Sequence, residues 1–240
     1  ERNPKWAPGQ PQDWYHTPAL SINLGCALAR GQFICLCHPE VVHAPDNFER
    51  AAARLANEQV YLFGTCLLGQ PSHNLLLENK TEWPAWGWEG LVAALDETGA
   101  MHYLSRECYW YLSFLPKEAV EAVGGVDFSF LHGTCGEDDD FRDRNGLAGW
   151  KPIYDDSIEG FHQDHSDETE AHRVRSTEHW REGQKRNRAL YYGRRNSGIY
   201  PIPANAGRDW RALECFVSED RYSLGSRTAE KVLVPEPLAS

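Results

Sequence analysis

The chain is organised around one acidic stretch, Gly136-Glu137-Asp138-Asp139-Asp140-Phe141-Arg142-Asp143-Arg144. Four consecutive carboxylates repel one another, so such a row needs a helix N-terminus, a cation or basic side chains one turn away to offset it. Two arginines stand four residues after two of the aspartates, and Gly136 permits a tight turn before a helix. A solvated helix start is the alternative for the row taken alone. The stretch predicts a helix that begins at the row and shares one face among Glu137, Asp140, Phe141 and Arg144.

The residues before the acidic stretch predict a strand and a short helix. Residues 110–115 form an apolar, aromatic run that is typical of a strand. Pro116 in the first turn and Gly124-Gly125 past the end mark the helix. The order is therefore strand, short helix, Gly-Gly-Val-Asp-Phe, loop and acidic row.

This order resembles the acceptor half of GT-A fold glycosyltransferases, nearest to the inverting family-2 enzymes, with an acidic run similar to that of the beta-1,4-galactosyltransferases. The likeness covers about Pro18 to His165 and implies an α/β fold: a GT-A-like mixed sheet flanked by helices, with its acceptor-side portion present. In those families the Asp directly after the Glu deprotonates the acceptor hydroxyl. The resemblance thus implies that Asp138 is the catalytic base and that Glu137 or Asp139 binds acceptor hydroxyls.

The first part of the chain predicts alternating helices and strands. Apolar residues recur at helical spacing from Ala19, and residues 32–37 predict a buried strand of a parallel sheet. Asp46 and Glu49 form a capping box for a helix from about Asn47 to Asn57. A further strand follows from Val60 to Leu68. This alternation indicates an α/β layered domain.

A metal site is implied at the end of the strand before His38-Pro39-Glu40. The segment resembles the family stretch that ends in an Asp-x-Asp site for Mg²⁺ or Mn²⁺, which neutralises a nucleotide-sugar diphosphate. Here His38 and Glu40 replace the two aspartates, and His162, with His165 second, matches a histidine that completes the site. A His-Pro turn with a solvated Glu is the alternative. A zinc site from His162, His165 and His172 is another.

An aromatic segment, Trp83 to Trp88, is interrupted by Pro and Gly and predicts a loop. Indole faces stack on sugar rings but also fill cores. Trp86 and Trp88 are therefore candidate acceptor-binding residues, with core packing as the alternative.

Composition narrows the class of protein. The chain has 240 residues and a net charge of -11, which argues against a general nucleic-acid binder because phosphate contacts need clustered Lys and Arg. No apolar run is long enough to span a bilayer. Seven cysteines without metal-type spacing indicate free thiols and a cytoplasmic location; a lumenal one applies if an anchor was removed.

Three parts follow from the patterns: a loop segment (1–18), the GT-A-like core (19–170), and a basic helical segment with a C-terminal tail (171–240). Eight Arg and Lys residues lie between His172 and Asn196. They predict a solvated helix that pairs with the acidic body, or a basic lip for an anionic donor or acceptor.

The function expected is an inverting glycosyltransferase that moves a sugar from a nucleotide-sugar donor to a carbohydrate or other hydroxyl acceptor. The segment before Phe33 is too short for a nucleotide pocket. Either a longer polypeptide or a partner chain supplies the pocket, or donor binding has been lost. The alternatives are a non-catalytic glycan- or partner-binding module and a DNA-modifying transferase that uses the Arg-rich segment.

Overall fold

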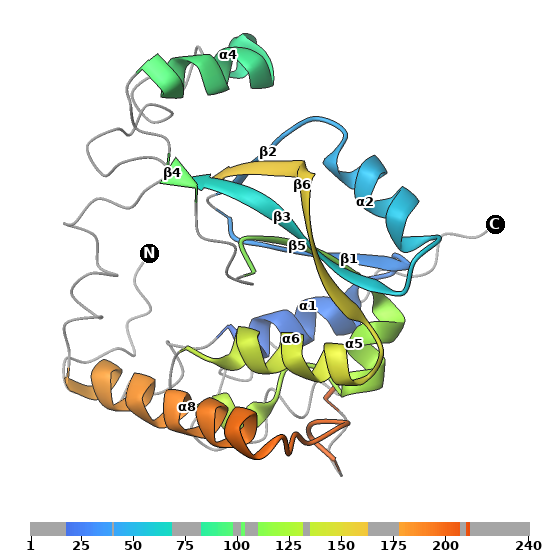
Figure 1. Ribbon diagram of the computed structural model, residues 1–240, viewed down its shortest axis with the longest axis vertical. Coiled ribbons are helices and arrows are strands. Elements are labelled where there is room, and N and C mark those ends of the chain that lie inside the picture. The colour runs from blue at the N-terminus through green and yellow to red at the C-terminus, as the bar shows by residue number, and fades with distance from the viewer. Residues whose placement is uncertain are drawn as a thin grey trace, which may run out of the picture.

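The computed structural model describes residues 18–39, 41–68, 83–97, 102–103, 110–131, 135–162, 178–206 and 210–211. These residues form an α/β fold in which a mixed sheet is flanked by helices (Figure 1), as predicted. None of the helices in these ranges is long and apolar enough to cross a membrane.

The sheet has the strand order β1-β5-β3-β6-β2, and β4 pairs with β3. The strands are β1 (Phe33–Cys37), β2 (Val41–His43), β3 (Val60–Leu68), β4 (His102–Tyr103), β5 (Leu112–Pro116) and β6 (Lys151–His162). β3 and β6 run parallel from Val60↔Lys151 to Leu68↔His162, with a register shift between Gly64 and Thr65. The other pairs are antiparallel.

The prediction that residues 32–37 belong to a parallel sheet is wrong. The partner of β1 among the described strands is β5, which runs antiparallel to it. Because β5 is also antiparallel to β3, however, β1, β3 and β6 all point the same way. Their carboxyl ends therefore meet at one edge of the sheet, and open α/β sheets bind ligands at this edge.

Helices cover both faces of the sheet (Figure 1). One face carries α1 (Ala19–Leu28), α5 (Lys117–Val123) and α6 (Glu137–Leu147), and the other carries α2 (Asn47–Leu55). β1 shows why both faces are apolar: Ile34 and Leu36 are buried with α1 and α5, whereas Phe33 and Cys35 pack against the α2 cluster. The basic helix α8 (Glu178–Ser197) lies outside α6, and the 3-10 turn η1 (Phe128–Phe130) precedes α6.

Two local predictions are wrong. Residues 83–88 are not a loop but the start of α4 (Trp83–Glu97), which kinks where Gly87 adopts a φ of 68°. The capping box does not form, because Asp46 has a left-handed backbone (φ 63°) and its side chain makes no capping hydrogen bond. A side-chain cap needs an extended backbone at this position.

Candidate functional site

A cavity of about 470 Å³ brings together segments that are far apart in the sequence. One wall comes from the sheet edge, with His38 after β1 and Trp110-Tyr111 before β5. A second wall is the start of α6, residues 135–139, and α8 contributes the third. The cavity thus joins the predicted strand-end site to the acidic row.

The start of α6 presents three of the four consecutive acids to the cavity, namely Glu137, Asp138 and Asp139. Gly136 precedes the helix with a φ of 83°, a left-handed conformation that glycine adopts without a steric cost. The predicted helix start is confirmed, and so is its buried face, since Glu137, Asp140, Phe141 and Arg144 are all buried.

Glu137 is only 5% exposed, and its Oε2 atom makes no hydrogen bond within the described part of the chain. Burial, together with the negative charge of Asp138, raises the pKa of this carboxyl to about 8. Glu137 is therefore mostly neutral at pH 7. A buried neutral carboxyl that lines a cavity can both donate and accept a hydrogen bond, as binding of a hydroxyl group requires.

Asp138 lines the same cavity and is partly buried. Burial and then the charge of Asp139 raise its pKa to about 6. Its Oδ1 atom accepts a hydrogen bond of 2.9 Å from the backbone N–H of Asp139. A carboxylate with this pKa is ionised at neutral pH yet more basic than an ordinary aspartate, as general base catalysis requires.

Asp139 differs from its neighbour because it forms an ion pair. Arg142 donates from Nη1 to Asp139 over 2.8 Å and from Nη2 to Asp143 over 2.6 Å. The spacing of four residues between Asp138 and Arg142 had suggested a pair of these two instead. Arg142 is thus engaged by Asp139 and Asp143, and Asp138 lines the cavity.

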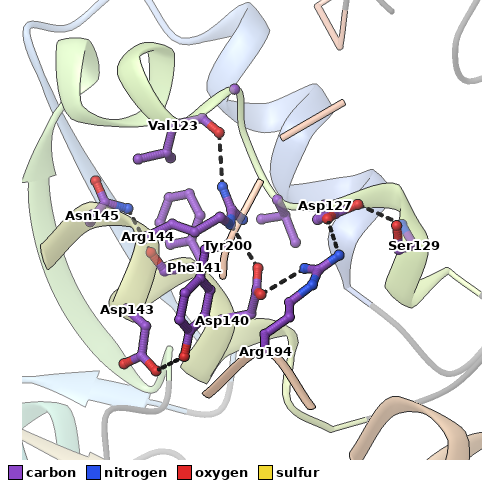
Figure 2. A network of polar contacts seen from close by, with 12 residues as sticks. Val123, Asp127, Ser129, Asp140, Phe141, Asp143, Arg144, Asn145, Arg194 and Tyr200 are labelled. Carbon is purple, nitrogen blue, oxygen red and sulfur yellow. Dashed lines mark hydrogen bonds and ion pairs between the residues drawn. The ribbon is translucent and has the colours of Figure 1, made fainter. Parts of the chain in front are cut away.

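The last acid of the row, Asp140, serves the fold rather than the cavity (Figure 2). It is fully buried and accepts from Arg144 Nε at 2.7 Å and from Arg194 Nη1 at 2.7 Å. Arg194 also donates from Nη2 to Asp127 at 2.8 Å. Burial opposes ionisation of Asp127, but the backbone N–H of Ser129 and the charge of Arg194 outweigh it and lower its pKa.

This network agrees with the prediction that the basic segment pairs with the acidic body, although the pairing is made by one largely buried arginine and not by the solvated face. Arg194, near the C-terminal end of α8, reaches into the protein and joins the Gly-Gly-Val-Asp segment to the acidic row (Figure 2). Tyr200, just past the helix, donates to Asp143 at 2.8 Å. Most of the other basic residues of α8 are exposed, as predicted.

Two of the three predicted metal ligands lie together. The ring centroids of His38 and His162 are 5.9 Å apart, and the ring of Tyr111 contacts both, at 4.5 and 4.8 Å. Imidazole nitrogens are common ligands of divalent transition metals. The described residues hold no group of three or more His, Cys, Asp and Glu residues that could bind a metal, and Glu40 lies outside them. His165 and His172 lie outside them too.

The aromatic side chains of the cavity are not the predicted ones. Trp88 lies on α4, beyond β4 and remote from α6 (Figure 1), and is not among the cavity residues. Trp86 is on the same helix, but its side chain is not among those that the structure describes. Acceptor contact stays a prediction for both. The cavity is lined instead by Trp110, Tyr111, Tyr191 and Tyr192.

Sequence reasoning missed these four residues for two reasons. Trp110 and Tyr111 stand directly before a strand, where an aromatic pair is ordinary core composition. Tyr191-Tyr192 carried a usable signal, because two adjacent tyrosines interrupt an otherwise basic helix.

Comparison of the chain with known protein families and with curated proteins found no match.

Proposed function

We propose that the chain is the acceptor-side part of an inverting glycosyltransferase of the GT-A class, with Asp138 as the general base. The observation that supports this most directly is the shared cavity of Asp138, Glu137 and His38 at the carboxyl ends of the strands. A base and a neutral carboxyl then lie side by side where an acceptor hydroxyl could bind.

The proposed reaction follows from these two side chains. Glu137 holds the acceptor by hydrogen bonds to its hydroxyl groups. Asp138 removes the proton of the reacting hydroxyl as that oxygen attacks the anomeric carbon. The bond from this carbon to the donor diphosphate breaks, and the nucleoside diphosphate leaves with the electron pair. A divalent cation, held by His38, His162 and Glu40, would supply charge neutralisation for the diphosphate.

The test is Asp138→Asn, which keeps the size of the side chain and removes its basicity. We expect it to lower turnover by about 10²- to 10⁴-fold, the usual contribution of a positioned base. Release of nucleoside diphosphate from a panel of nucleotide-sugars, with mixed glycan acceptors, measures this. The matched control is Asp46→Asn, since Asp46 is exposed and asparagine tolerates its left-handed backbone. Equal turnover of Asp138→Asn and parent would remove Asp138 from the proposed role.

A non-catalytic glycan-binding module is the second candidate. Two observations favour it: the cavity is lined by four aromatic side chains, and the described residues provide only two of the expected metal ligands. Calorimetric titration with nucleotide-sugars in the presence of Mn²⁺ separates the two candidates. Heat with one donor supports the enzyme, and no heat with any donor, combined with glycan binding, supports the module.

A further inference from the structure

Helix α8 turns one face toward the cavity. Arg188, Tyr191 and Tyr192 line it, and their spacing of three and four residues places them side by side on the helix. These residues stand opposite the acids at the start of α6. The buried contacts of Arg194 with Asp127 and Asp140 fix the helix in this position (Figure 2).

Arg188 differs from Arg194 in having no structural role. It is exposed, it lines the cavity, and it forms no ion pair or hydrogen bond with any part of the chain that the structure describes. Three carboxyl groups line the same cavity, yet none of them holds this guanidinium. A guanidinium left open at a cavity wall is suited to an anion such as a carboxylate or phosphate, two oxygens of which can accept parallel hydrogen bonds from it.

Tyr192 provides an open aromatic surface beside Arg188. It is 51% exposed, and its ring centroid lies 5.3 Å from that of Tyr191. Tyr191 is itself buried, and its hydroxyl donates to Asp143 at 3.1 Å and accepts from Arg142 at 3.2 Å. Tyr192 therefore rests on a fixed neighbour and presents an aromatic ring to a ligand, as a stacked sugar ring requires.

We propose that helix α8 selects the acceptor, and that this acceptor is a glycan with an anionic substituent, whose sugar ring lies on Tyr192 and whose anion binds Arg188. The inference rests on the proposed function, since it assigns the acceptor of the same cavity. It also orients the acceptor. The carboxylate of Asp138 repels the anion, so the substituent points to α8 and a hydroxyl group points to Asp138.

Equilibrium binding of matched sugars to the full chain, followed by ligand-observed NMR, tests this without a donor. The pairs are methyl β-glucoside with methyl β-glucuronide and methyl β-galactoside with methyl β-galacturonide; glucose 6-phosphate and galactose 6-phosphate separate a phosphate from a carboxylate. We expect at least one anionic sugar to bind about tenfold more tightly than its neutral partner, as a charged hydrogen bond gives.

Two variants of α8 assign the preference to its residues. Arg188→Ala should bring the anionic and neutral sugars within about twofold of each other, because it removes only the charged contact. Arg186→Ala is the control, since Arg186 is an exposed arginine of the same helix that does not line the cavity. Tyr192→Ala should weaken both sugars several-fold, whereas Tyr192→Phe should bind them as the parent does, because phenylalanine keeps the stacking surface.

Three results would overturn the inference: no anionic preference in any pair, equal loss in Arg186→Ala and Arg188→Ala, or unchanged binding in Tyr192→Ala. The turnover of Asp138→Asn is a separate measurement. If Asp138→Asn is inactive while the sugars show no anionic preference, the glycosyltransferase stands and the acceptor assignment fails. If the preference is found but Asp138→Asn is as active as the parent, the acceptor site stands and the base assignment fails.

Discussion

At the scale of single residues, neighbouring acids of one helix turn have different tasks. Glu137 is buried and mostly neutral, Asp138 lines the cavity with a pKa raised to about 6, Asp139 pairs with Arg142, and Asp140 is held in the core by Arg144. Their positions around the first turn of α6 produce these differences, since successive residues of a helix point about 100° apart. One row of like charges therefore supplies both a candidate site and a structural anchor.

Glu137 makes the stability of the protein depend on pH. Its pKa is about 8 in the folded protein and ordinarily 4.5, so between these values the folded state holds a proton that the unfolded state has lost. The proton on Glu137 therefore stabilises the folded state fully below pH 4.5, and this stabilisation is lost as the pH rises through about 8. Glu137→Gln cannot ionise and should escape this loss.

The parent should lose stability relative to Glu137→Gln as the pH rises. The difference in free energy of unfolding should move in favour of Glu137→Gln by roughly 3–4 kcal/mol between about pH 5 and about pH 8.5. Urea unfolding at both pH values measures it. Glu49→Gln, an exposed position in the first turn of α2, is the control and should show no such gain. A constant difference between Glu137→Gln and the parent would mean that the carboxyl does not titrate in this range.

At the scale of elements, the start of α6 depends on Gly136. An alanine there would be held in a left-handed conformation, with its Cβ 3.1 Å from the Cβ of Tyr191. We expect Gly136→Ala to destabilise the fold by about 1–2 kcal/mol. It should also lower turnover, because Glu137 and Asp138 follow directly. Chemical denaturation and the diphosphate-release assay check both effects.

Gly146 provides the matched control in the same helix. It lies inside α6 with ordinary helical geometry, and the nearest atom to an added Cβ is Pro152 Cδ at 3.6 Å. Gly146→Ala should therefore stabilise the protein by about 0.5–1 kcal/mol through helix propensity. Opposite signs for the two substitutions support the assigned helix start; the same sign for both contradicts it.

The attachment of α8 depends on Arg194. Arg194→Met keeps much of the side-chain volume but leaves the buried carboxylates of Asp127 and Asp140 without this partner. We expect a loss of about 3–5 kcal/mol in the free energy of unfolding, the cost of breaking a buried ion pair from one side. Arg186→Met, an exposed position of α8, should stay within about 0.5 kcal/mol of the parent. Similar losses in both variants would show that Arg194 has no special role.

Sequence patterns predicted local elements well and the contacts between them poorly. β3 has the predicted bounds, and α1, α5 and α6 begin within a residue of the predicted positions, because caps and periodicity are local signals. The direction of β1 depends on its pairing with β5, about 80 residues away, and no local signal carries it. The tasks of Arg194 and Tyr192 depend likewise on how α8 packs against α6.

The same limit applies to the candidate site. Asp138 and Glu137 could be named because they stand in a motif, and the cavity does join them to His38. The ionisation of these carboxyl groups could not be predicted, since burial is the largest cause of both pKa shifts. Burial is set by packing that a linear pattern does not record.

At the scale of the whole molecule, charge is unevenly distributed: the chain carries a net charge of -11, yet α8 is basic. If surface attraction held α8 to the acidic body, added salt would screen it and lower stability. The ion pairs of Arg194 involve two buried aspartates and are therefore screened less, while salt relieves the repulsion among the excess acids.

We therefore expect the free energy of unfolding to stay constant or rise by less than about 1 kcal/mol between about 0.05 M and about 0.5 M NaCl. Urea denaturation at each salt concentration measures it. Arg194→Met should lie below the parent by a similar amount at every concentration, because the contact that it removes is buried. A marked fall in parent stability with salt would show instead that exposed charges attach α8, and Arg194 would then not be its principal anchor.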